Sequence, residues 1–242
     1  MIVGLGTAAN AAAIIVGGIA GLMFKKGLKE NLRSTLMQAL GASIIFIGAA
    51  GTLKGMLYVD GVSLDTQNSM ILIFSLVIGA LIGELLKIKK HTERFGAFLK
   101  EKFGGRDDSK FIDGFVAASL TVCVGAMAIV GSLEDGLTGD ASTLYAKAVL
   151  DGLIIMVFAS VFGKGAVFSA IPVVLFQGLI TALAALAAPL FTDVVIANMS
   201  FVGSVLIFCV GVNLMFDKEI NVANMLPSVF VSIPLTYLAI LI

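Results

Sequence analysis

The chain has 242 residues, of which 59% are hydrophobic and only 13% are charged, and its mean hydropathy is +1.06. A soluble domain carries about twice that share of charged residues, so the composition excludes an ordinary soluble protein. Sixteen basic residues balance sixteen acidic ones, which leaves no excess positive charge for binding nucleic acid. The composition therefore indicates an integral membrane protein whose surroundings are a lipid bilayer.

Long apolar segments predict eight transmembrane helices, because a bilayer core of roughly 30 Å requires about 20 residues of helix. In chain order they cover residues 2–24, 33–57, 68–88, 110–132, 143–162, 165–188, 194–216 and 222–241. Backbone groups must be paired inside each span, and a helix does this locally. The predicted fold class is therefore all-α, with one polytopic bundle that includes the whole chain, 1–242.

The basic residues predict the orientation of this bundle. Fourteen of the sixteen Lys and Arg fall at connections on one side, and only Lys54 and Lys147 fall on the other. Connections rich in Lys and Arg stay in the cytoplasm, so we expect both termini outside it. Residues 89–109 then form a cytoplasmic amphipathic connection, which either lies among the lipid headgroups or is a solvated linker that touches the bundle.

Two pairs of similar segments suggest an internal repeat. Residues 115–125 align with 201–211 without gaps, and six of the eleven positions are identical. The predicted spans at these positions run in opposite directions, so spans 3–5 and 6–8 are expected to form an inverted repeat, an arrangement found in secondary transporters. The pairs Gly17/Gly21 and Gly79/Gly83 also match; small residues four apart allow helices to pack closely, or they line a pore.

The segment 125–140 has the highest density of polar residues within the apolar regions. Four glycines in sixteen residues favour a broken or re-entrant backbone. Oxygen-bearing side chains suited to a cation follow one another there: Ser132, Glu134, Asp135, Thr138 and Asp140. The alternative is an acidic outer loop without a ligand.

Two charges follow within a predicted span, since Lys147 and Asp151 lie four residues apart. This spacing places them on one helix face, where they can neutralise each other. They are either part of a cation or solute site, with Asp151 deepest, or an interfacial ion pair with a structural role.

Three amides also fall deep within predicted spans, namely Asn10, Gln177 and Asn213. Such side chains hydrogen-bond between helices in lipid, or they contact a substrate. Together with Ser132, Glu134, Asp135, Asp140, Lys147 and Asp151, they make up the predicted substrate-binding set. We expect no catalytic residue, no metal centre and no cofactor, because Cys123 and Cys209 have no Cys or His at ligand spacing.

Three long motifs resemble a bacterial family. They are GAMAIVGSLEDGLTGDASTLYAKAVLDG at 125–152, NAAAIIVGGIAG at 10–21 and FSAIPVVLFQGLIT at 168–181. Each is similar to the YdfK/YqgA-like integral membrane proteins, a family with a domain of unknown function. The resemblance covers the whole chain and implies a protein of the bacterial inner or plasma membrane. It implies no substrate and no catalytic residues.

These features favour a transporter or channel for an ion or small polar solute, driven by a gradient or passive. The chain has no nucleotide-binding motif and no large soluble domain to act as a motor.

A membrane subunit that assembles or senses without transporting is the alternative. The small-residue faces also suggest a homo-oligomer, most simply a dimer. An intramembrane enzyme is a remote alternative, because Asp140 and Asp151 occupy a single hairpin and the cysteines have no activating His.

The predicted orientation can be tested with single cysteines. Ser63→Cys and Ser109→Cys should be labelled from opposite sides of intact cells, because they belong to connections on opposite sides of the membrane. An impermeant maleimide added outside should modify the first and not the second. Labelling of both from outside would contradict the orientation.

Overall fold

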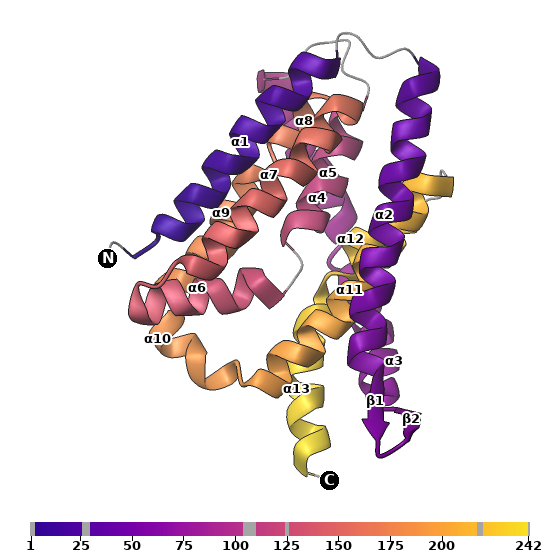
Figure 1. Cartoon of the computed structure of the whole chain (residues 1–242), viewed down its shortest axis with the longest axis vertical. Helices are drawn as coiled ribbons and strands as arrows, with labels where there is room; N and C mark the ends of the chain where they lie inside the picture. Colours follow the sequence, from indigo (N-terminus) through magenta and orange to yellow (C-terminus); the bar gives the residue numbers. More distant parts are fainter. Residues whose placement is uncertain (1–2, 26–29, 104–109, 124–125, 217–219, 242) are drawn as a thin grey trace. The chain divides into compact units, whose positions relative to one another are not determined.

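The computed structural model describes residues 3–25, 30–103, 110–123, 126–216 and 220–241 (Figure 1). These residues are almost entirely helical, with one short antiparallel hairpin, which confirms the all-α prediction. Ser109 and Gly125 lie outside the described part of the chain, and so do four of the fourteen basic residues counted on one side, Lys26, Lys29, Arg106 and Lys218.

The elements follow one another along the chain as drawn in Figure 1. The first half contains α1 (Leu5–Lys25), α2 (Glu30–Met56), β1 (Leu57–Asp60), β2 (Ser63–Thr66), α3 (Ser69–Leu85), α4 (Ile88–Phe103) and α5 (Phe111–Cys123). The second contains α6 (Ala126–Thr138), α7 (Ser142–Phe162), α8 (Lys164–Val167), α9 (Ala170–Ala182), α10 (Ala184–Ala187), the 3₁₀ turn η1 (Ala188–Leu190), α11 (Asp193–Phe216), α12 (Val222–Met225) and α13 (Pro227–Leu241).

The described residues contain five helical stretches that are long and apolar enough to cross a membrane, or up to seven if two bent pairs count as single spans. The predicted number was eight. The second predicted span, 33–57, forms α2. The apolar part of this helix is Gly41–Met56, which is shorter than the stretches counted as long enough to cross a membrane. The predicted span 110–132 is divided between α5 and α6, whose axes differ by 61° over Phe111–Cys123 and Met127–Thr138.

The chain forms two compact units, each assembled from separated segments. Unit 1 contains Met1–Met37, His91–Cys123 and Met127–Ala188, and unit 2 contains Gln38–Lys90, Val124–Ala126 and Pro189–Ile242. The two segments aligned as a repeat belong largely to different units, with α5 in unit 1 and α11 in unit 2. The inverted repeat itself stays a prediction.

In unit 1, α1 packs along α7 through backbone contact at its glycines. A Cβ atom at Gly17 would lie 2.1 Å from the carbonyl oxygen of Gly152, and one at Gly21 would lie 2.1 Å from that of Met156. The contacts advance together along both helices, so α1 and α7 run in the same direction. Only glycine permits this separation, because any side chain would overlap the carbonyl groups of α7.

The third helix of this group, α9, returns along α1 in the opposite direction. Gly163 makes the reversal with a backbone φ of +92°, which is a conformation that favours glycine. Gly18 then contacts Val167 just before α9, whereas Asn10 contacts Gln177 within it. Because the order of the contacts is reversed, α1 and α9 are antiparallel, and α7 and α9 both pack against α1.

The amphipathic connection packs against the same unit. Leu99 of α4 is buried with Phe111 and Phe115 of α5, and the rings of Phe95 and Phe115 meet edge to face at 5.8 Å. Phe98 on the same helix remains about half exposed. Helix α4 therefore contacts the bundle along one row of side chains, while residues 104–109 of the connection lie outside the described part of the chain.

In unit 2, glycines also allow two helical segments to pack closely, but these segments are antiparallel. In α3, a Cβ atom at Gly79 would lie 2.2 Å from Ser228 Oγ, and one at Gly83 would lie 1.8 Å from the carbonyl oxygen of Asn224. The contacts run in opposite directions along the two segments, so α3 is antiparallel to α12–α13. The glycine pairs that match in sequence therefore serve a parallel contact in unit 1 and an antiparallel one in unit 2.

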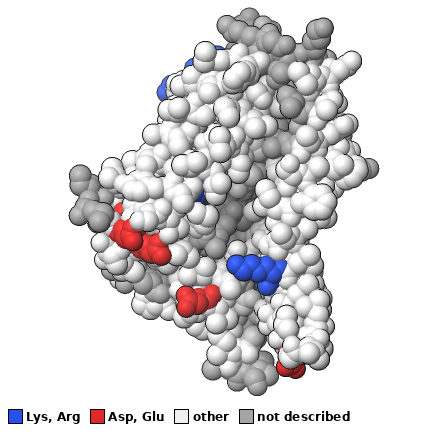
Figure 2. All heavy atoms as spheres, viewed as in Figure 1, with Lys and Arg blue, Asp and Glu red and all other residues white. Residues whose placement is uncertain are grey.

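The outer surfaces of the helices are apolar. Large hydrophobic side chains stand exposed along α1, for example Val16, Ile19 and Met23, and most of the face in Figure 2 carries no charged residue. Water would disfavour such a surface, since soluble monomers rarely expose large continuous apolar patches. The arrangement fits a multi-pass protein whose helices face lipid.

Close packing of α1 on α7 can be tested with two matched substitutions. Gly17→Ala should destabilise the protein by about 2 kcal/mol and lower its Tm by roughly 4–8 °C, because the new methyl group overlaps the α7 backbone. Gly178→Ala is the control, since a Cβ atom in that α9 position meets no atom within 4 Å. Thermal unfolding in detergent measures both, and equal Tm values for the two variants would contradict the packing.

Candidate functional site

The interior of unit 1 contains a buried ion pair. Lys147 and Asp151 lie one turn apart on α7, and only 6% and 4% of their surfaces are exposed. The Lys147 ammonium donates a hydrogen bond to Asp151 Oδ2. Asp151 lies roughly 14 Å along α7 from Ser142, at a rise of about 1.5 Å per residue, which is near the middle of this 21-residue helix. The spacing of four residues therefore produces the expected pair, with Asp151 near the middle of the helix.

Two amides extend the ion pair to the neighbouring helices. Asn10 Nδ2 of α1 donates to Asp151 Oδ2 at 3.0 Å and lies 3.4 Å from Gln177 Oε1 of α9. Both amide side chains are completely buried. Asn10 and Gln177, which the sequence places deep in separate spans, thus meet each other and the carboxylate.

The lysine also contacts the end of a fourth helix. Its Nζ atom donates to the carbonyl oxygen of Val122 at 2.8 Å, and Val122 is the penultimate residue of α5. Carbonyl groups in the last turn of a helix have no partner within it and carry partial negative charge. A continuous series of polar contacts therefore connects α5, α7, α1 and α9 through Val122, Lys147, Asp151, Asn10 and Gln177.

Four buried polar atoms beside this series have no hydrogen-bond partner among the described residues: Thr7 Oγ1, Asn10 Oδ1, Gln177 Nε2 and Thr181 Oγ1. Thr7 precedes Asn10 by one turn, and Thr181 follows Gln177 by one turn. Because α1 and α9 are antiparallel, the two threonines lie on the same side of the amide pair. Buried polar groups are normally paired, so this line of donors and acceptors is the part of unit 1 best suited to bind a polar ligand.

The threonines and the Val122 carbonyl were missed by the sequence analysis. Helical spacing would have identified the threonines, since Thr7 and Asn10 are three apart and Gln177 and Thr181 are four apart, and both spacings share a helix face. No sequence signal identifies Val122, because its contribution is a backbone carbonyl made available by the end of α5.

The broken or re-entrant backbone expected at residues 125–140 occurs as a bend of 61° between α5 and α6, and not at the glycines inside α6. Gly131 and Gly136 lie inside the regular helix α6, and only Gly139, with φ of +72°, occupies a turn. The two helical glycines instead permit close contacts, because a Cβ atom at Gly136 would lie 2.5 Å from the Thr181 carbonyl oxygen. Tertiary packing therefore accounts for the two glycines inside α6, whereas the break in the span lies between α5 and α6.

The polar side chains of α6 and its turn have separate local partners. Ser132 Oγ donates to the carbonyl oxygen of Ala128 at 2.6 Å, and Glu134 Oε2 accepts from Thr143 Oγ1 at 2.7 Å. Asp135 is fully buried, and its two carboxylate oxygens accept from the Gly4 N–H at 3.1 and 3.2 Å. Ser132 therefore bonds within its own helix, Glu134 joins α6 to α7, and Asp135 joins α6 to the residue before α1.

Asp140 is exposed and caps the start of α7. Its Oδ1 atom accepts from the Ser142 hydroxyl at 2.6 Å and from the Ser142 N–H at 2.9 Å. Both bonds lower the pKa of the Asp140 carboxyl below its usual value, and the bond from the Ser142 hydroxyl has the larger effect. The carboxylates of the segment do not converge, and within the described ranges no three His, Cys, Asp or Glu residues lie close enough to hold a metal ion.

The last member of the predicted set belongs to unit 2. Asn213 accepts from the Ile220 N–H and donates to the Ile220 carbonyl oxygen, each at 2.9 Å. It thereby holds the chain after α11 in place and takes no part in the buried series of unit 1.

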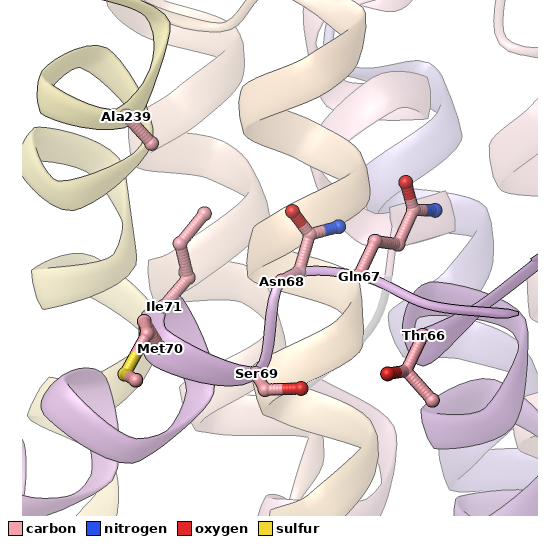
Figure 3. A pocket seen from close by; sticks show the side chains of 7 residues that line it. All are labelled: Thr66, Gln67, Asn68, Ser69, Met70, Ile71 and Ala239. Atoms are coloured by element: carbon pink, nitrogen blue, oxygen red, sulfur yellow. The ribbon is translucent and has the colours of Figure 1, made fainter. Parts of the chain in front are cut away.

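A surface hollow of about 330 Å³ lies in unit 2 at the start of α3 (Figure 3). It is lined by Thr66, Gln67, Asn68, Ser69, Met70, Ile71 and Ala239. No charged side chain lines it, and Asn68 Nδ2 donates to the Gly55 carbonyl oxygen at 3.2 Å. The Asn68 amide serves the turn between β2 and α3, so the buried series of unit 1 is the stronger site.

The fold and the buried charges define the class of the protein as a polytopic α-helical membrane protein. Residues 5–237 match the family described as "Protein of unknown function (DUF554)", and the chain belongs to this family. It is 30% identical to "Uncharacterized membrane protein YdfK" of Bacillus subtilis (strain 168) over 93% of both chains. It is 29% identical to "Uncharacterized protein YqgA" of Escherichia coli (strain K12) over 96% of both. No solved structure matches the chain.

The buried ion pair predicts a strong coupling between its two members. Lys147→Met should lower the free energy of unfolding by about 3–5 kcal/mol, because it leaves the Asp151 carboxylate buried without a counter-charge. Asp151→Asn should have a similar cost, since it leaves the ammonium unpaired. The double variant should recover most of the loss, because no isolated charge remains.

A double-mutant cycle by thermal or denaturant unfolding in detergent measures this coupling. Additive losses in the single and double variants would show that Lys147 and Asp151 are independent and would contradict the ion pair.

Proposed function

We propose that this protein moves a small ion or polar solute across the membrane, by passive flux or driven by a gradient. The observation that supports this is the series of buried polar contacts across α5, α7, α1 and α9. A charged side chain near the bilayer centre costs about 2.5–3.5 kcal/mol on insertion scales, and α7 retains two charged side chains, Lys147 and Asp151, that are almost completely buried. Ionisable groups inside membrane helices typically face a pathway for ions or solutes.

A purely structural role explains this series less well. Replacing a buried ion pair by apolar side chains of similar volume is often neutral or even stabilising, so packing alone does not require Lys147 and Asp151. A polar network built for stability also has its members satisfied, whereas Asn10 and Gln177 each keep one amide atom without a partner. Unpaired donors and acceptors beside a charge pair favour a ligand site.

We place the proposed transporter in the bacterial cell membrane with both termini outside the cytoplasm, as the distribution of Lys and Arg indicates. It acts without an enzymatic step, and its partners are the lipid bilayer and the solute. A homodimer stays a proposal with less support than the sequence suggested, because Gly17, Gly21, Gly79 and Gly83 all pack within the protomer.

Flux through purified protein in proteoliposomes tests the function. Vesicles are loaded with a pH-sensitive dye, and gradients of K⁺ or Na⁺ are imposed; osmotic swelling in urea or glycerol detects neutral solutes. Wild-type protein should raise at least one flux above that of empty vesicles. Asp151→Asn should lower it at least tenfold, because the carboxylate is the only acidic group of the series.

Two further variants make the flux test specific. The double variant Lys147→Met/Asp151→Asn should be stable but inactive, whereas Asp65→Asn, in the exposed strand β2, should keep wild-type flux. Full flux in the double variant would exclude the site. No flux of any of these solutes in wild-type vesicles would favour an assembly or sensor subunit instead.

A further inference from the structure

We propose that the oxygen atoms around the Lys147 ammonium form a binding site for a small monovalent cation, and that Lys147 occupies this site as a tethered substitute for the ion. The inference rests on the proposed transport function and names its substrate class. Its starting point is the position of one positive group between a helix end and a carboxylate, in the interior of unit 1.

The atoms that Lys147 contacts are oxygens of the kind that bind cations. Its ammonium group meets the Val122 carbonyl oxygen at 2.8 Å and Asp151 Oδ2. Carboxylate and carbonyl oxygens are ligands for hard cations, and the C-terminal end of α5 adds a favourable dipole. Ammonium and K⁺ carry the same charge and have similar radii, so an ion can take the place of the ammonium group.

Asn10 and Gln177 can supply a third oxygen. Asn10 now turns Nδ2 toward Asp151 and Gln177, while Asn10 Oδ1 and Gln177 Nε2 lack partners. A half-turn of both amide groups would keep a hydrogen bond between them, with Gln177 now the donor. The same rotation would direct Asn10 Oδ1 toward the carboxylate, where it could contact a cation. The unpaired Asn10 Oδ1 is an acceptor and the unpaired Gln177 Nε2 is a donor, so the rotated amides can form the hydrogen bond between them.

The charge of the site favours a monovalent ion. Asp151 is the only carboxylate in the series, and in the part of the chain that the structure describes no cluster of three potential metal ligands of the His, Cys, Asp or Glu type occurs. Calcium sites usually contain several carboxylates among six to eight oxygen ligands. One carboxylate balances one positive charge, so Lys147 and the bound ion are alternatives, and the return of Lys147 would release the ion.

Removing the tethered ammonium should make protein stability depend on an external cation. Lys147→Met protein in nanodiscs is unfolded thermally in KCl, NaCl or NH₄Cl, with N-methylglucamine chloride keeping the ionic strength constant. At least one of the three cations should raise the Tm saturably, by about 5–10 °C when its concentration is roughly 100 times Kd. Wild-type protein should show a much smaller rise, because a cation must first displace Lys147 from the site.

Two controls separate the site from general salt effects. Lys147→Met/Asp151→Asn should lose the rise, because the carboxylate is gone, and Lys54→Met removes an exposed lysine of α2 and should behave as wild type. Lys147→Gln provides a second test of the same kind, since its amide can still donate to Val122. The proposal would be overturned if the Tm of both Lys147→Met and Lys147→Gln did not respond to any of the three cations. Failure of Lys147→Met and Lys147→Gln to fold in every salt would also overturn it, because an added cation should take the place of the missing ammonium group.

The outcomes also distinguish this inference from the proposed function. A saturable, Asp151-dependent rise in Tm without flux in proteoliposomes would support the cation site and contradict transport. Flux of a solute through wild-type protein, with no cation response in Lys147→Met or Lys147→Gln, would support transport and overturn the cation site.

Discussion

The cost of burying charge in an apolar bundle is the constraint on which the interior of unit 1 depends. Lys147 and Asp151 lie near the middle of α7 with almost no exposed surface, so each charge must be neutralised and hydrogen-bonded within the protein. Asp151 receives hydrogen bonds from Lys147 and Asn10, and Lys147 takes a second partner at the end of α5. These contacts favour one register of α5 and α1 against α7, because a shift of either helix along its axis would break the bond from Lys147 to Val122 or from Asn10 to Asp151.

Close helix packing makes these polar contacts possible. The glycines of α1 bring its backbone against that of α7, so the short side chain of Asn10 can reach the Asp151 carboxylate. The reversal at Gly163 brings α9 back along α1 and places Gln177 beside Asn10. Small residues and polar residues therefore act together: the former set the helix separation, and the latter determine which groups meet.

Several elements of the site follow from local rules, and others do not. The pairing of Lys147 with Asp151 follows from their spacing on one helix, and the depth of Asn10 and Gln177 follows from their positions in apolar segments. The helical state of Gly131 and Gly136 does not follow from the sequence, because their local cost in a helix is outweighed by packing against α7 and α9. Asp135 is similar, since its partner is the N–H of Gly4, 131 residues away.

By itself, the sequence determined the class of the protein, its all-α fold and most of its apolar segments, because the bilayer requires long, continuously apolar helices and leaves a strong compositional signal. It also indicated that Asn10, Lys147, Asp151 and Gln177 lie within apolar segments. Only the tertiary structure decided which of them meet, because Asn10, Val122, Lys147, Asp151 and Gln177 come from four helices whose neighbours depend on side-chain packing. The bend after α5 exposed a carbonyl group to Lys147, and glycine contacts brought α1 to α7; both depend on the shapes of facing helices, which no single segment encodes.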